Sequence, residues 1–310
     1  MNAGIEFPLV GAGGERVDLW RTLDSHGFTA LPPMRLDDSD DARSLEITVP
    51  TGRGRPRSVR ISGERFGPGR LEVLGPAASP TATDRLLAVV RHVLRLDEDL
   101  SGFYSAVAND PDLAWAAGGA GRMVQSPTVF EDVVKTVCTT NCAWSATERM
   151  VGAIVEHLGD RAIGAPPDGA FGCAFPTAAT MAEAGEDFYR DVARAGYRGA
   201  YLVELARSVA EGEVDLEALG RAGDDELSDE EAEARLIALP GVGPYAAAHI
   251  LMTIGRYSHL ILDSWTRPTY ARLVGRKVVA DRTIERRFRR YKRYAGLAFW
   301  LFLTREWVAD

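Results

Sequence analysis

The stretch Leu239–Ile250, LPGVGPYAAAHI, decides how the second half of the chain folds. It follows the helical pattern AEARLIAL, and that helix is expected to stop at Pro240. Another helical pattern begins at about Pro244. Glycine permits tight turns and removes the side chain that would keep a ligand away. The sequence therefore predicts two helices joined by a four-residue turn, which consists of Pro240, Gly241, Val242 and Gly243.

This turn could bind an anion through its backbone. The amides of the turn and of the first residues of the next helix can point outward, unpaired, at the positive end of that helix. A DNA phosphate suits such a place, because backbone contacts position a duplex without reading its sequence. The same glycines are also compatible with a plain turn between two helices, so the motif alone leaves both interpretations open.

The charge of the chain is distributed unevenly. The net charge is −8, which by itself argues against nucleic acid. From Glu211 to Glu233, however, eleven acids face the single Arg221, whereas from Arg235 onward fourteen Lys or Arg face five acids, a local charge of +9. Polyanion binding depends on local charge, so the basic block around the turn favours a surface that faces phosphates. Solvated helix faces are the alternative explanation.

The pattern of hydrophobic residues divides the chain into two parts. The segments SLEITVP, SVRISGE and RLEVLG are short, apolar or alternating, and separated by Gly and Pro, as antiparallel strands are. From TATDRLLAVVRHVLRL onward, apolar residues recur three and four apart, as in helices. Ser228 and Glu231 predict a capping box. We expect an α+β protein, with an antiparallel β-rich domain over residues 1–96 and a helical domain over 97–310.

Composition narrows the class of protein further. The 310 residues are 46% hydrophobic, which is typical of a globular protein. No apolar run is long enough to span a bilayer and the N-terminus has no export pattern, so we expect no membrane partner and a cytoplasmic location. Three cysteines are too few for a disulfide framework or a four-cysteine metal pattern. Cys138 and Cys142 are expected to be small buried residues, and no metal site is predicted.

At this point the sequence resembles the helix-hairpin-helix DNA glycosylase superfamily, which includes endonuclease III, 8-oxoguanine glycosylase and the bacterial alkylbase glycosylases. LPGVGPYAA (239–245 and beyond) is similar to the hairpin of that superfamily, and LILDSWTRPTYARL, within 260–273, is similar to the segment with its catalytic aspartate, here Asp263. Upstream, RLDEDLSGFY, FEDVVKTVCTTNCAWSATERM, AGYRGAYLVELA and WRTLDSHGFTALPP are similar to segments of the 8-oxoguanine and alkylbase branches. The resemblance covers nearly the whole chain. It implies a two-lobed helical domain and a monomeric enzyme that acts on double-stranded DNA with a damaged base in the bacterial nucleoid.

Two departures from the superfamily pattern bear on the mechanism. Members that also cleave the strand have a lysine, which forms a Schiff base, where this chain has Tyr245. A phenol cannot form that adduct, so the resemblance implies a monofunctional enzyme in which water attacks. The C-terminal FWLFLTREWVAD has no cysteine loop, so no iron–sulfur cluster is expected. We expect no cofactor, except that the hairpin could hold a monovalent cation.

Asp263 is the candidate catalytic residue. Breaking an N-glycosidic bond leaves positive charge on the sugar, which a nearby carboxylate stabilises while it activates water. Asp263 lies between the apolar LIL and Trp265, where a carboxylate is partly desolvated and acts strongly on a developing cation. It could also cap the helix that begins near Ser264, a role compatible with catalysis.

The candidate pocket residues follow from base flipping. A glycosylase takes its target base out of the duplex, and aromatic faces replace the lost stacking. Tyr245 and His249 are four apart and share a helix face, while Trp265 and Tyr294 are further candidates that could equally be core residues. Asn141 aligns with an asparagine that, in the 8-oxoguanine branch, probes the orphaned partner base. It could instead satisfy backbone groups at a helix break.

Two other functions are compatible with the sequence. One is a non-catalytic DNA-binding protein of the same fold, for which the unusual DSWTRP context, with Pro268 early in a helix, is the best argument. The other is a bifunctional glycosylase and lyase on oxidised bases that uses Lys135 or Lys292. We expect an alkylated base as substrate, although its identity depends on the shape of the pocket.

Overall fold

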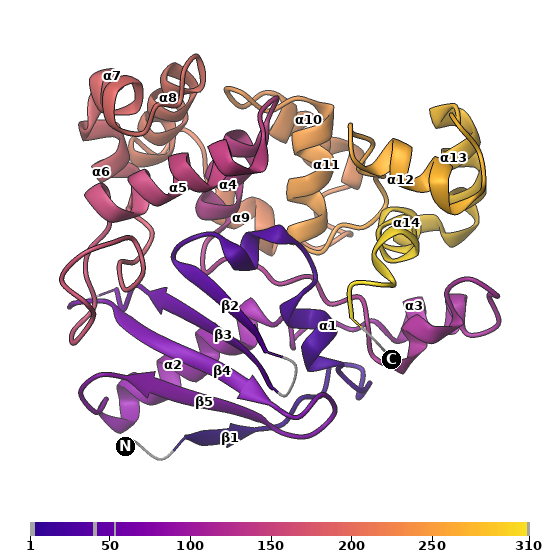
Figure 1. Cartoon of the computed structure of the whole chain (residues 1–310), viewed down its shortest axis with the longest axis horizontal. Coiled ribbons are helices and arrows are strands. Elements are labelled where there is room, and N and C mark those ends of the chain that lie inside the picture. Colours follow the sequence, from indigo (N-terminus) through magenta and orange to yellow (C-terminus); the bar gives the residue numbers. More distant parts are fainter. Residues whose placement is uncertain (1–3, 40–41, 53, 309–310) are drawn as a thin grey trace.

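The computed structural model describes residues 4–39, 42–52 and 54–308. Its first part holds a five-stranded antiparallel sheet with the strand order β1-β5-β4-β3-β2 (Figure 1). The strands are β1 (Ile5–Phe7), β2 (Met34–Ser39), β3 (Ala42–Val49), β4 (Arg57–Gly63) and β5 (Gly69–Leu74). The three strands that the sequence predicts are β3, β4 and β5, and they are confirmed.

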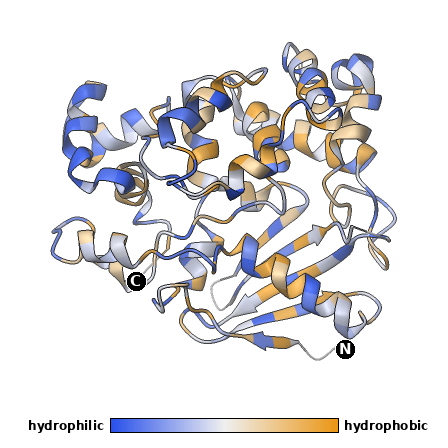
Figure 2. Cartoon of the chain, turned by 180° about the vertical axis from the view of Figure 1, so that it is seen from behind, coloured by the Kyte–Doolittle hydropathy of each residue, from blue (hydrophilic) through white to orange (hydrophobic). Residues whose placement is uncertain are grey.

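The sheet is apolar on the face that α2 (Pro80–Val93) covers. Leu45 of β3 lies opposite Ile61 of β4, which lies opposite Leu71 of β5, so one row of apolar side chains crosses the sheet. These residues share a core with the buried face of α2, which contributes Leu86, Val90 and Val93. Figure 1 shows α2 behind the sheet and Figure 2 shows it in front. Side chains alternate along a strand, so this packing fixes the register.

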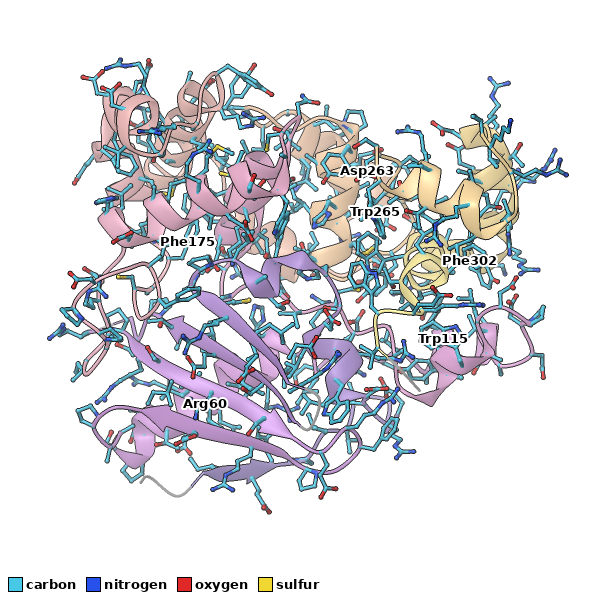
Figure 3. All side chains as sticks on the ribbon, viewed as in Figure 1. Arg60, Trp115, Phe175, Asp263, Trp265 and Phe302 are labelled. Carbon is cyan, nitrogen blue, oxygen red and sulfur yellow. The ribbon has the colours of Figure 1, made fainter. Side chains whose placement is uncertain are left out.

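The other face of the sheet is charged. Arg60 of β4 binds Glu46 of β3 at 2.5 Å and Glu72 of β5 at 3.2 Å, and Arg35 of β2 also pairs with Glu46. Figure 3 shows Arg60 on the open side of the sheet. Such exposed pairs contribute little to stability. The sign of the charge alternates from one strand to the next, so each charged side chain lies beside an opposite charge on the neighbouring strand.

Helices and short turns make up the rest of the described chain. Two lie before β2, namely α1 (Leu19–Leu23) and η1 (Gly27–Ala30). After α2 come α3 (Ser101–Val107), η2 (Ala114–Gly118), α4 (Val129–Thr139), α5 (Trp144–Leu158), α6 (Ala178–Glu183), α7 (Gly185–Asp187), η3 (Phe188–Val192), α8 (Arg198–Ala210) and α9 (Leu216–Arg221). The last are α10 (Asp229–Ile237), α11 (Pro244–Thr253), α12 (Thr266–Leu273), α13 (Asp281–Phe288), η4 (Arg289–Tyr294) and α14 (Ala295–Thr304). Among the described residues, no helix has the length and apolarity needed to cross a membrane.

The helices form two lobes that meet at α11. One core contains buried residues of α4, α5, α8 and α10, and the other contains buried residues of α3, α13 and α14. Helix α11 contributes Ala247 and Ile250 to the first core and Ala248 and Met252 to the second. In Figure 1, α4 and α5 lie on one side of α11 and α12 and α13 on the other. The expected α+β class with a two-lobed helical part is therefore confirmed, while the division of the chain at residue 96 stays a prediction.

Gly296 sets how closely α14 approaches the segment that precedes Asp263. Its amide donates a hydrogen bond to the carbonyl of Tyr257 at 2.7 Å. A Cβ at this position would collide with the carbonyl oxygen of His259 and lie 2.9 Å from that of Tyr257. Backbone atoms cannot move aside as a flexible side chain can, so only glycine fits here.

We expect Gly296→Ala to lower the free energy of unfolding by about 1–3 kcal/mol, the usual cost of overpacking. Gly152, in the middle of α5, is the matched control, because a Cβ there meets nothing within 4 Å. Gly152→Ala should raise stability by about 0.5–1 kcal/mol through helix propensity. Urea unfolding followed by tryptophan fluorescence measures both changes. Equal effects of the two substitutions would contradict the role given to Gly296.

Candidate functional site

The hairpin forms between α10 and α11, as the sequence predicts. Helix α10 ends at Ile237, slightly before Pro240, and α11 begins at Pro244. At the start of α10, the hydroxyl of Ser228 accepts a hydrogen bond from the amide of Glu231 at 3.1 Å. The carboxylate of Glu231, however, pairs with Arg235 at 2.6 Å. Only half of the predicted capping box is therefore shown, because an arginine one turn ahead competes for the carboxylate.

The two glycines of the hairpin have different roles. Gly241 has a φ of 77°, in the left-handed region, and a Cβ there would lie 2.9 Å from the ring of Tyr201. The fold itself therefore requires Gly241. Gly243 has a φ of −101° and a ψ of −178°, and a Cβ there would meet nothing within 4 Å. The space beside Gly243 is open to a ligand.

The start of α11 presents backbone donors to this open space. Gly243 is the N-cap residue and supplies no side-chain cap, and Pro244 has no N–H. The amide of Ala247 donates to the carbonyl of Gly243 at 2.9 Å, so the amides of Tyr245 and Ala246 precede the first helical hydrogen bond. Unpaired amides at the positive end of a helix form an anion site.

Asp263 is held rigidly at the start of α12. Its Oδ1 accepts hydrogen bonds from the amides of Trp265 at 2.8 Å and Thr266 at 2.6 Å, and its own amide donates to the hydroxyl of Thr266 at 2.8 Å. The structure therefore shows the expected capping role. Among the described residues none donates a hydrogen bond to Oδ2, and the side chain is only partly buried. One carboxylate oxygen thus fixes the helix while the other stays available.

Pro268 is compatible with this arrangement. It is the third residue of α12, within the first turn, where a missing N–H costs no helical hydrogen bond. The amide of Arg267 still reaches the carbonyl of Asp263 at 3.3 Å, and that of Thr269 reaches Trp265 at 3.1 Å. The DSWTRP context therefore builds a regular helix start, so it is no argument against a functional Asp263.

Tyr245 lies at the junction of the two lobes, close to Asp263. Its hydroxyl is 3.3 Å from that of Thr139, at the end of α4. Burial raises the pKa of Tyr245, the Thr139 hydrogen bond opposes this, and the negative charge of Asp263 adds to it. The phenol is therefore neutral. Its ring lies 6.2 Å from that of His249, which confirms that the two residues share one side of α11.

The aromatic rings that pack against His249 besides Tyr245, those of Phe28 and His26, come from the N-terminal part of the chain. The rings of His249 and Phe28 of η1 lie 4.8 Å apart, and that of His26 lies 6.1 Å from His249. Nδ1 of His26 accepts a hydrogen bond from the amide of Phe28 at 3.2 Å, so Nε2 carries the proton and donates to the carbonyl of Val124 at 2.7 Å. Our sequence reasoning did not assign Phe28 and His26 to the site. The signal was present in DSHGFTALPP, a segment included in the family resemblance.

Both imidazoles are neutral. Burial lowers the pKa of His249 to about 3, with a smaller contribution from His26. Burial also lowers the pKa of His26 to about 4, although its hydrogen bond to Val124 opposes the shift. A neutral imidazole has one donor and one acceptor nitrogen. His249 can therefore offer a hydrogen bond to a ligand without adding positive charge to the site.

The other predicted pocket residues lie in different surroundings. Trp265 is 39% exposed, next to Asp263 in Figure 3, and its ring lies 5.7 Å from that of Trp300 and 5.8 Å from that of Trp307. Tyr294 packs instead on Phe103 of α3, at 5.5 Å. The structure thus places Trp265 beside Asp263, whereas Tyr294 makes no ring contact with Tyr245 or His249 in the described chain. Tyr294 is held by the apolar core of the second lobe.

Asn141 lies in the turn between α4 and α5. Its φ of 47° is in the left-handed region, which asparagine tolerates better than most residues. Its side-chain amide donates to the hydroxyl of Tyr197 at 3.4 Å, and both residues are exposed. Arg198 holds the same turn through a 3.0 Å hydrogen bond to the carbonyl of Thr140. Within the described residues, the side chain of Asn141 makes no hydrogen bond to the backbone of its own turn, so it is available to another molecule.

The two lysines of the lyase alternative lie in different surroundings. Lys135 is fully buried in α4 and lies 2.6 Å from the carboxylate of Glu131. Lys292 is exposed and lines a groove together with Tyr245. As for metals, no group of three or more His, Cys, Asp or Glu that could hold an ion occurs in the part of the chain that the structure describes.

The lowered pKa of His249 predicts a change in pH dependence. The folded pKa of His249 is depressed, so the unfolded chain binds more protons and stability is lost as the pH falls below about 6.5. We expect His249→Phe, which keeps a ring against Phe28, to lower the slope of unfolding free energy against pH by up to about 1.4 kcal/mol per pH unit between about pH 6 and pH 4. Urea unfolding of both proteins across that range measures the slope, since the other titrating groups cancel. An unchanged slope would show that His249 is not buried in its neutral form.

Comparisons with known proteins concern the fold. No protein-family model matches the sequence, and no curated protein matches it. Among solved structures, the 3-methyladenine DNA-glycosylase from Archaeoglobus fulgidus is 20% identical, with a TM-score of 0.72 over 99% of this chain and 100% of that one. The 8-oxoguanine glycosylase/lyase from Clostridium acetobutylicum, without ligand, is 18% identical, with a TM-score of 0.70 over 97% and 98%. The same protein in complex with double-stranded DNA containing cytosine opposite 8-oxoguanine is 18% identical, with a TM-score of 0.61 over 87% and 97%.

These similarities extend over both the sheet and the helical lobes. At such low identity they establish the fold alone. The chain has the fold of the 3-methyladenine and 8-oxoguanine DNA glycosylases, as the resemblance of its hairpin and its Asp263 segment implies.

Proposed function

We propose that the protein is a monofunctional DNA glycosylase that removes a damaged base, expected to be alkylated, from double-stranded DNA. The observation that carries the proposal is the pairing of a neutral Tyr245 at the exit of the hairpin with Asp263, whose Oδ2 is available. The similar folds support an action on DNA. We expect the enzyme to work as a monomer and without a cofactor; a monovalent cation at the hairpin is not required by the reaction.

The hairpin would bind a phosphate beside the damaged nucleotide. The amides of Tyr245 and Ala246 precede the first helical hydrogen bond of α11, and the space next to Gly243 is open, so a phosphate there could accept from them. A phosphate at that point would place the sugar near Asp263, because Tyr245 directly follows the hairpin and lies close to Asp263. Asn141 and the neighbouring Tyr197, on the other side of the hairpin, are suited to contact the bases left in the duplex.

The extruded base would lie against Tyr245, which is half-buried and lines a groove, with His249 beside it and Phe28 supporting His249 from the core. Aromatic faces replace the stacking lost on flipping. His249 can donate or accept one hydrogen bond, and its neutrality avoids repulsion of a base that carries positive charge. Trp265, exposed beside Asp263, completes the aromatic surroundings, and Tyr294 takes no part in this arrangement.

The chemical step would be the hydrolysis of the N-glycosidic bond. As the bond between C1′ and the base nitrogen breaks, its electron pair leaves with the base and positive charge develops on the sugar. The available oxygen of Asp263 stabilises that charge, and it accepts a proton from the water whose oxygen bonds to C1′. Tyr245 has no amine, so the strand remains intact.

We expect Asp263→Asn to reduce base release by about a hundredfold or more, while binding to a duplex changes within a few-fold. Asparagine keeps the oxygen that accepts from the amides of α12, so the fold is preserved. Asp215→Asn is the matched control, because Asp215 caps α9 with a 2.8 Å hydrogen bond to the amide of Ala218 and lies outside the site. Single-turnover excision from duplexes with one alkylated base measures the rate. Full activity of the Asp263 variant would remove it from the mechanism.

We expect the products to be a free base and an abasic strand that is cut only after alkali treatment. Borohydride should trap no covalent complex, because no Schiff base forms. Tyr245→Phe should retain most activity, since it loses only the weak hydrogen bond to Thr139. Tyr245→Ala should lose about 1–3 kcal/mol of stacking, seen as weaker capture of the flipped base. A trapped adduct with the native protein would support the lyase alternative, and Lys292→Ala would then be tested first.

A further inference from the structure

Next to the hairpin lies a groove of about 800 Å³ with a basic wall. Pro244, Tyr245 and Leu262 line it on the side of the site. Helix α13 and the residues after it line the other side with four cationic side chains, which are Arg282, Arg286, Arg289 and Lys292. We propose that this groove is a second binding surface for DNA phosphates, separate from the hairpin, which holds the duplex on one side of the damaged base. This inference rests on the proposed function.

Arg282 and Arg286 lie on one face of α13, and Arg289 follows directly at the C-terminal end of that helix. Arg282, Arg286 and Arg289 are four and three residues apart, which places them in a row along a helix. The opposite face is fixed, since Ile284 and Phe288 are buried in the core of the second lobe. The row therefore cannot turn away from the groove. At 1.5 Å per residue it extends over about 10 Å, roughly the length of three base pairs.

The cationic residues from position 282 to position 293 fall into two groups, those with a carboxylate partner and those without one. Arg287 pairs with Asp112 at 2.7 Å, Arg290 with Asp110 at 2.5 Å and Arg293 with Asp224 at 2.8 Å. By contrast, within the described ranges no carboxylate is within salt-bridge distance of Arg282, Arg286, Arg289 or Lys292. The segment thus neutralises the arginines that face the rest of the protein and leaves those that face the groove without counter-charges.

The acidic residues of the groove do not cancel this charge. Glu233 lies 3.3 Å from His259, and Glu285 is exposed among the arginines. A fifth cation of the lining, Arg267, is bound by Asp281 through two contacts of 2.8 and 2.9 Å. Four unpaired cations therefore face two carboxylates, and the groove has a positive field. A concave positive surface that continues into the hairpin suits a polyanion better than it suits solvent.

The position of the groove makes the grip on DNA one-sided. In Figure 1, α13 lies on one side of α11, and the turn that carries Asn141, between α4 and α5, lies on the other. Figure 2 shows α13 in hydrophilic colours. A duplex bound at the hairpin would therefore contact the groove on one side of the damaged base only.

The test measures the affinity for duplexes that contain tetrahydrofuran, a stable abasic analogue, near one end or near the other. The double variant Arg286→Ala/Arg289→Ala removes two groove cations. The matched control, Arg190→Ala/Arg293→Ala, removes two exposed arginines that pair with aspartates outside the groove. We expect the groove variant to lose about tenfold in affinity and to flatten the slope of log K against log salt by about 1.8, and the control to change neither. The loss should occur with only one of the two asymmetric duplexes.

Further outcomes keep this inference separate from the proposed function. Gly243→Asp places a negative charge at the hairpin and should weaken binding to both duplexes. If that variant binds weakly while the groove variant behaves as its control, the groove is not a DNA surface and the inference is wrong. Equal losses of affinity for both duplexes in the groove variant would show that the groove does not contact the DNA on one side of the lesion only. Failure of the native protein to bind either duplex would overturn the proposed function together with the inference. Thermal melting of each variant confirms that it is folded.

Discussion

The structure depends on the burial of one short helix between two hydrophobic cores. Helix α11 is packed by the first lobe on one face and by the second on the other, and its run of alanines permits both lobes to approach closely. A helix surrounded in this way cannot rotate or slide without opening a cavity in one of the cores. The hairpin, Tyr245 and His249 are all attached to it. Their positions are therefore set by the packing of the whole helical part.

At Asp263, one side chain has both a structural and a proposed chemical role. Its carboxylate caps α12 with one oxygen, which fixes the orientation of the group, and the other oxygen accepts no hydrogen bond from the described residues. Gly296 brings α14 against the carbonyls of Tyr257 and His259, just before this segment, and so supports it from behind. Stability and the proposed chemistry thus use the same contacts.

Charge is organised by pairing. Although the chain carries a net charge of −8, carboxylates at positions 110, 112 and 224 are committed to arginines of the α13 segment, and the cations beside the hairpin remain unpaired. Around the proposed base pocket the opposite holds, since burial keeps His249 and His26 neutral. The protein therefore presents positive charge where phosphates would lie and a neutral wall where a base would lie.

The sequence by itself determined the local features. Glycine and proline at fixed places specified the hairpin, alternation specified β3, β4 and β5, and helical spacing put Tyr245 and His249 on one face, because each of these depends on residues close together in the chain. The tertiary structure alone decided the long-range contacts. It brought Phe28 and His26 from the N-terminal part to His249, and it packed Tyr294 onto Phe103. It also left the groove arginines of the α13 segment without a carboxylate partner among the described residues, while Asp110, Asp112 and Asp224 paired with their neighbours in that segment. Such contacts follow from how elements pack and which charges meet, and no periodicity in the sequence records them.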